Sequence, residues 1–177
     1  MLSLLRKTLA LTLVIIVVTA IVAVGTAVAA KVTVNIKGGS LVLTPSGDSS
    51  LTDVTLDGTD QSTTGALAQV RVRDGRGTGV GWSLTLSATD FEEINDPSKT
   101  IAASGFSVSA VNMTREAGSP AGSVTQNAGA LSPPLTMMNA TAPGGRGSYR
   151  AIPDLSLLVP AETFVGTYAS TVTQTLL

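Results

Sequence analysis

The chain of 177 residues lacks cysteine and histidine altogether. Without cysteine it can form no disulfide, no thiolate zinc site and no thiol nucleophile, and without histidine it has no Ser-His or Cys-His catalytic arrangement. Aromatic residues make up only 3% and charged residues only 13% of the chain, which is rich in Ser, Thr, Gly, Ala and Val. This composition is typical of short strands joined by glycine-rich turns, in a domain stabilised by its core alone.

The first thirty residues predict a signal for export. Arg6 and Lys7 precede an uncharged run from Thr8 to Val28, and Ala27-Val28-Ala29 has the small-x-small pattern of a signal-peptidase site. We therefore expect a signal peptide helix over residues 1–30 and a single domain over residues 31–177. Since roughly 20 apolar residues can cross a bilayer, an uncleaved anchor stays open as the alternative, with membrane contact only through this segment.

Charge excludes nucleic acid as a partner. Once Arg6 and Lys7 are removed from the eleven Lys and Arg, nine remain against twelve Asp and Glu, a net charge of about −3. Basic clusters with interleaved aromatic residues, which nucleic-acid binding requires, are absent from the sequence.

The acidic residues predict neither a metal site nor an enzyme. Asp53, Asp57 and Asp60 lack the ligand spacing of a calcium loop. A glycosidase needs two carboxylates that face each other across a cleft. The acids of a second group lie together before Pro97 and are expected in a solvated loop: Asp90, Glu92, Glu93 and Asp96. We predict no catalytic residue, no metal and no cofactor.

Alternation of apolar and polar residues predicts strands through most of the exported part. Val32, Val34 and Ile36 would share one face of a half-buried strand, and Phe106, Val108 and Ala110 are expected to point inward. Residues 117–147 look irregular, and no amphipathic helix follows residue 30. The pattern predicts an all-β fold, an antiparallel β-sandwich, with strands within Lys31–Ile36, Ser40–Thr44, Leu51–Gly58, Ala66–Gly75, Val80–Ala88, Thr100–Thr114, Ser148–Ile152, Leu155–Pro160 and Phe164–Leu177.

Trp82, the only tryptophan, follows a turn rich in glycine and arginine. It could form a stacking platform for a sugar ring or belong to the core. Because it is in phase with Leu84 and Leu86, the core is favoured. The neighbouring glycines open a strand rather than a helix, which excludes a phosphate-binding loop.

Several segments resemble the WxL domain, an exported surface domain named for a repeated Trp-x-Leu motif. "VRVRDGRGTGVGWSLTLSATDF" is similar to its first signature, "GGRGSY" to its Gly-x-Gly-aromatic segment, and "LLVPAETFVGTYASTVTQTLL" to its closing strands. Gln174 stands where the second tryptophan would fall. It shares a face with Tyr168, Val172 and Leu176, and in the interior its amide would need hydrogen-bond partners. The resemblance implies these motif and binding candidates: Asp74, Arg76, Gly81, Trp82, Leu84, Tyr149, Tyr168, Gln174 and Leu176.

The resemblance also implies a function. Members of that family are non-enzymatic, attach noncovalently to the bacterial cell wall, with peptidoglycan as the proposed ligand, and associate with other surface proteins. We therefore expect a secreted, extracellular domain that binds wall polymer or a surface protein. The alternative is a structural fibre or coat subunit that assembles by β-strand addition, for which Lys31–Ile36 could supply the strand.

Overall fold

A computed structural model describes residues 31–118 and 123–177, so the predicted signal peptide and its helix lie outside the described residues. The chain divides into residues 1–36 and a compact unit of residues 37–177. The compact unit is built almost entirely of antiparallel strands, which confirms the predicted fold class. Within the described ranges, no helix is long and apolar enough to cross a membrane.

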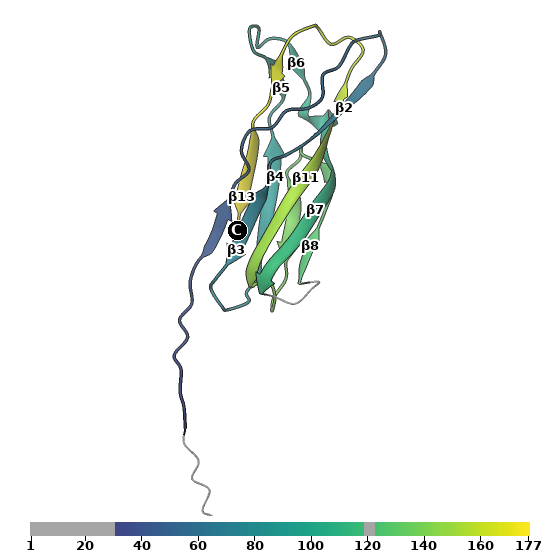
Figure 1. The fold of residues 1–177 in the computed structure, drawn as a ribbon. Helices are drawn as coiled ribbons and strands as arrows, with labels where there is room; N and C mark the ends of the chain where they lie inside the picture. Colours follow the sequence, from purple (N-terminus) through teal and green to yellow (C-terminus); the bar gives the residue numbers. More distant parts are fainter. Residues whose placement is uncertain (1–30, 119–122) are drawn as a thin grey trace, which may run out of the picture. The chain divides into compact units, whose positions relative to one another are not determined.

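The largest sheet has the strand order β1-β3-β11-β7-β9, and β2 also pairs with β11. Figure 1 labels β2, β3, β7 and β11 of this sheet. Its two 13-residue strands, β7 and β11, pair along the whole of β7 and along Gly147–Leu157 of β11. The strands of this sheet are β1 (Leu41–Thr44), β2 (Gln61–Ala66), β3 (Val70–Asp74), β7 (Phe106–Gly118), β9 (Gly129–Ala130) and β11 (Gly147–Val159).

Pro153 marks the point in β11 where one neighbouring strand replaces another. β3 pairs with Gly147–Ala151, and β2 pairs with Asp154–Val159 on the same side. Proline cannot donate a ladder hydrogen bond, so the change of partner falls where no donor is available. The two strands predicted around this proline are therefore a single one.

Two smaller sheets complete the compact unit. The four-stranded sheet has the order β13-β4-β10-β8, and the three-stranded sheet has the order β12-β5-β6. A 3-10 turn, η1 (Ala103–Gly105), precedes β7. The strands are β4 (Trp82–Ala88), β5 (Phe91–Glu93), β6 (Thr100–Ile101), β8 (Val124–Gln126), β10 (Leu135–Ala140), β12 (Tyr168–Ala169) and β13 (Val172–Leu176).

The inner faces of the two larger sheets share one hydrophobic core. Val70 and Val72 of β3 and Leu84 and Leu86 of β4 are almost completely buried, as their alternation predicts. Full burial of such a side chain contributes about 1.5–3 kcal/mol to folding. Near the third sheet, Phe91 and Phe106 pack edge to face with ring centroids 4.9 Å apart.

The predicted strand at residues 31–36 is wrong. These residues form no strand, and the side chains of Val32, Val34 and Ile36 are 93%, 82% and 86% exposed. Alternation shows which face of a strand can be buried, but a strand forms only when an edge is available to pair with it.

Three other expectations also require correction. Leu51–Gly58 is not a strand, because only Leu51 bridges to β2, at Gly65. Ala110 is exposed and Val111 buried instead, since Ser109 is an extra residue in the β7–β11 register. Residues 117–147 are not simply irregular, because they contain β8, β9 and β10.

Candidate functional site

The first group of candidate residues meets at the turn between β3 and β4, residues 75–81, which we call the motif turn. Asp74, the last residue of β3, is buried, and its Oδ1 accepts hydrogen bonds from the Arg76 backbone N–H at 3.0 Å and from Nε at 2.9 Å. Its Oδ2 accepts from Arg76 Nη2 at 3.0 Å. Arg76 Nη2 also donates to the Gly81 carbonyl at 2.7 Å. The turn is thus closed by one bidentate ion pair and one bond to the start of β4.

This arrangement shifts the ionisation of both partners. Hydrogen bonds from the Arg76 guanidinium hold the pKa of Asp74 below its ordinary value, against the effect of burial, which would raise it. The same bonds raise the pKa of Arg76. Asp74 is therefore a charged structural anchor and not a proton donor at neutral pH.

Trp82 connects this turn to the segment before β11. The side chain is 4% exposed, and its Nε1 donates to the Gly145 carbonyl at 2.9 Å. Its ring lies 5.7 Å from the ring of Tyr149, at a tilt of 59°. The Tyr149 hydroxyl lies 3.0 Å from Ser123 Oγ. Trp82 belongs to the core, and the stacking-platform hypothesis has no exposed indole face to support it.

The second group of candidate residues lies along β13. Leu176 pairs with the buried Leu84 of β4, and Gln174 pairs with Leu86. Gln174 is half-buried, and its Oε1 accepts a hydrogen bond from the Ser46 backbone N–H at 3.2 Å, while its Nε2 donates to Ser46 Oγ. The amide at the position of the second tryptophan thus has the partners that burial requires, and it ties β13 to the segment after β1.

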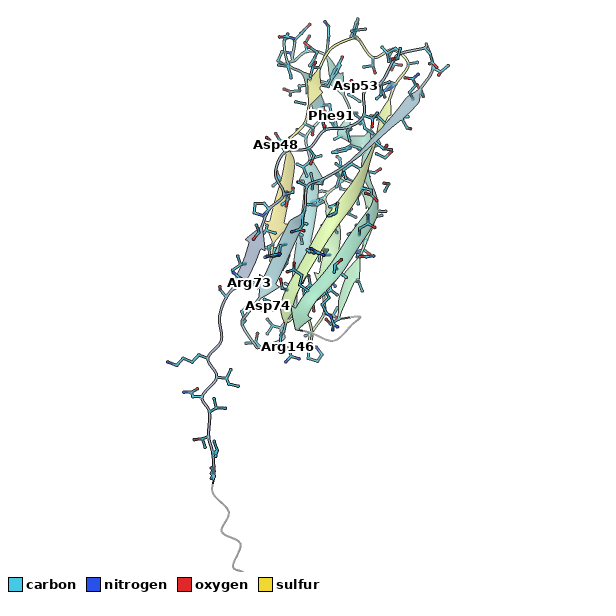
Figure 2. The ribbon with its side chains drawn as sticks, in the orientation of Figure 1. Asp48, Asp53, Arg73, Asp74, Phe91 and Arg146 are labelled. Carbon is cyan, nitrogen blue, oxygen red and sulfur yellow. The ribbon has the colours of Figure 1, made fainter. Side chains whose placement is uncertain are left out.

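A cleft of about 980 Å³ opens next to Gln174. We call it the loop cleft, and define its two walls as residues 46–56 and 163–172. Its floor is apolar, and its walls carry many Ser, Thr and Asp side chains. Figure 2 shows Asp48, Asp53 and Phe91 of the cleft well away from Asp74 and Arg146 at the motif turn. Core residues form the floor: Phe91, Ile101, Phe106, Leu155, Leu157 and Val159.

Aromatic residues stand on the second wall of the loop cleft. Tyr168, a candidate residue, is half-buried, and its hydroxyl donates to the Phe164 carbonyl at 2.9 Å. Phe164 is 65% exposed, and Lys99 Nζ lies 5.3 Å from its ring centroid. Tyr168 therefore positions the loop that presents the Phe164 ring to solvent.

The structure separates seven of the nine predicted candidates into two sets, and the other two, Leu84 and Leu176, pair with each other between β4 and β13. Asp74, Arg76, Gly81, Trp82 and Tyr149 lie together at the motif turn, and all but Arg76 and Gly81 are fully buried. Tyr168 and Gln174 line the loop cleft. Sequence reasoning missed Ser46 and Phe164, because the exposure of Phe164, one of only three phenylalanines, is visible only in the structure.

The acidic residues mostly hold loops in place. Asp57 accepts hydrogen bonds from Thr59, and Asp60 Oδ1 accepts from the Ala161 N–H at 2.9 Å. Glu93, expected in solvent, is instead 5% exposed and accepts two bonds from Asn95. Within residues 31–118 and 123–177 no group of three or more acidic side chains is arranged to hold a metal ion.

Comparison with protein-family models identifies the family. A family model described as "WxL domain surface cell wall-binding" matches residues 32–176. The matched range includes both the motif turn and the loop cleft. No curated protein matches the chain.

Proposed function

The chain belongs to the WxL domain family of surface, cell wall-binding domains, and on this premise we propose that it attaches noncovalently to a wall polymer through the loop cleft, without catalysis. The domain acts at the cell surface, as its family does. The ligand we propose is the glycan part of peptidoglycan. A surface protein bound at the same cleft is the other partner class that the family permits.

The loop cleft is the observation that carries this proposal. Its volume of about 980 Å³ is at the upper end of the range for ligand sites. A sugar chain offers hydroxyl groups along its edges and apolar C–H groups on its ring faces. The loop cleft offers the matching groups, with hydroxyl-bearing walls and an apolar floor, and the exposed ring of Phe164 stands at its rim.

The motif turn has a different part in the proposal. Because Trp82 and Asp74 are buried and their polar atoms are hydrogen-bonded within the domain, they have few groups left for a ligand. They connect β3, β4 and the segment before β11, and this scaffold keeps the cleft walls in place.

Sedimentation with purified cell-wall sacculi tests the proposal. The exported protein should bind saturably, and binding should persist at 0.15 M salt and above, where exposed charges are screened beyond about 8 Å. Salt resistance is expected because a domain with a net charge of about −3 cannot rely on attraction to an anionic wall. Protein that remains in the supernatant, or that binds only at low salt, would refute binding through the hydroxyl and apolar groups of the cleft.

A further inference from the structure

Lys31–Ile36 presents an unusual apolar surface. The side chains of Val32, Val34 and Ile36 are all more than 80% exposed. The polar residues Thr33 and Asn35 stand between them in the sequence. Three β-branched apolar residues at every second position are typical of a strand with one buried face. The segment thus has the pattern of a strand but no partner among the described residues.

The β7 strand presents an open edge. On one side it pairs with β11 along its whole length, whereas on the other β9 pairs only with Ser107 and Val108. Among the described residues, no strand pairs with this second side of β7 beyond Val108. Proteins normally protect exposed sheet edges against pairing with other chains by keeping the edge strand short or by placing proline or charged residues on it. From Ala110 to Arg115 the register with β11 is regular, so this part can accept a six-residue strand.

The exposed segment and the open edge are complementary in pattern. On β7, Val111 is buried and Met113 half-buried against the core, whereas Asn112 and Thr114 are exposed on the outer face. An antiparallel strand that pairs Thr33 with Thr114 sets Val34 opposite Met113 and Ile36 opposite Val111. Apolar side chains then extend the inner face of the sheet and cover Met113, while polar side chains stay outside.

We propose that Lys31–Ile36 of one copy adds as an antiparallel strand to β7 of a second copy, with Val32–Ile36 opposite Val111–Arg115. This inference goes beyond wall binding, because its partner is another molecule of this chain. A contact between two different surfaces repeats from copy to copy, so it builds rings or filaments rather than closed pairs.

Covalent reach excludes pairing with β7 of the same chain. The Gly39 N–H donates to the Gly75 carbonyl at 2.7 Å, which fixes the chain at the β1–β3 margin of the sheet. Ile36 is three residues away and can extend about 10 Å from that point. In the order β1-β3-β11-β7, a strand added outside β7 lies four spacings from β1, or about 19 Å at 4.7–4.9 Å each. Only another copy can provide the strand.

Hydrodynamic size of the exported protein tests this proposal. Wild-type oligomers should grow with protein concentration, and Val34→Asp should abolish them and leave monomer, because a carboxylate would be buried beside Met113. Thr33→Asp is the matched control and should still assemble, since the side chain at position 33 stays on the solvent-exposed face of the sheet. Val34 is so exposed that its replacement should leave the melting temperature unchanged. A wild type that is monomeric at every concentration, or Val34→Asp oligomers of wild-type size, would overturn the proposal.

Cross-linking tests the register, and the chain contains no cysteine that could interfere. A Thr33→Cys chain mixed with a Thr114→Cys chain should form a disulfide-linked pair under oxidation, whereas a Ser62→Cys chain on β2 should not replace the Thr114→Cys partner. A chain carrying both Thr33→Cys and Thr114→Cys that closes a disulfide within a single molecule at high dilution would overturn assembly between copies. Val34→Asp should bind sacculi like the wild type, so failure of assembly and failure of wall binding give different results.

Discussion

The indole of Trp82 donates a hydrogen bond to the carbonyl of Gly145 at 2.9 Å, and the two residues lie 63 positions apart. This contact joins the two glycine-rich segments that carry the family motifs. The motif is therefore a set of long-range contacts inside the domain, and replacement of its members should affect stability first.

Trp82→Ala should lower the free energy of unfolding by about 3–5 kcal/mol, because it removes a buried ring and leaves a cavity against Tyr149. Urea denaturation measures the change. Val80→Ala, two residues earlier and 63% exposed, is the control and should change the same quantity by less than about 0.5 kcal/mol. A near-neutral Trp82→Ala variant would contradict the core assignment.

Gly145→Ala should be more destabilising than Gly77→Ala. Both glycines have positive φ, at 81° and 75°, so alanine is strained at each. An added Cβ at Gly145 would lie 2.7 Å from Trp82 Nε1, whereas at Gly77 it would meet no atom within 4 Å. The two variants should differ in free energy of unfolding by about 1–3 kcal/mol, and this difference measures the cost of the steric clash at Gly145. Equal losses would show that the domain relaxes around the extra methyl group.

Stability should fall in acid partly through Asp74. Its pKa in the folded protein is lowered by Arg76, below the unfolded value of about 3.9. The stabilisation is thus complete above the unfolded value and is lost as pH falls through the folded one. Asp74→Asn should reduce the free energy of unfolding at neutral pH by about 1–3 kcal/mol and should flatten its decline below about pH 4. Melts from pH 2 to pH 7 that stay parallel for variant and wild type would contradict this role.

Gln174→Leu should destabilise the domain by about 1 kcal/mol despite the gain in apolar surface, because the Ser46 N–H loses its acceptor in a half-buried position. Thr173→Leu provides the comparison, since its side chain is exposed and should be close to neutral. Thermal melts measure both. A more stable Gln174→Leu variant would show that the amide contributes less than the burial of a leucine does.

Local sequence patterns correctly predicted which side chains of a single strand point into the core. The phase shared by Trp82, Leu84 and Leu86 is visible in seven residues, and all three are buried. β2 went unpredicted because "QSTTGA" has no apolar alternation and forms through its pairing with β11. The inward position of Val111 depends on a bulge that only the partner strand reveals.

The loop cleft could not be predicted from the sequence. Its walls are more than 100 residues apart in the chain, and the hydrogen bonds between Ser46 and Gln174 beside them span 128 positions. Alternation predicted strands at Leu51–Gly58 and Phe164–Leu177, which overlap the walls, but neither wall is a regular strand for most of its length. The alternation of Lys31–Ile36 was visible, but a pattern cannot tell whether the edge that accepts a strand belongs to the same molecule.

Sacculus binding by a Phe164→Ala variant tests the central claim most directly. The ring is 65% exposed at the rim of the loop cleft, so its removal should leave the melting temperature unchanged. Ile152→Ala, which removes a 42% exposed apolar side chain of β11 outside the cleft, is the control. If the loop cleft holds the wall polymer, Phe164→Ala should raise the dissociation constant about tenfold, which is a loss of about 1.4 kcal/mol of binding free energy. Ile152→Ala should bind like the wild type. Wild-type affinity in the Phe164→Ala variant would contradict the account.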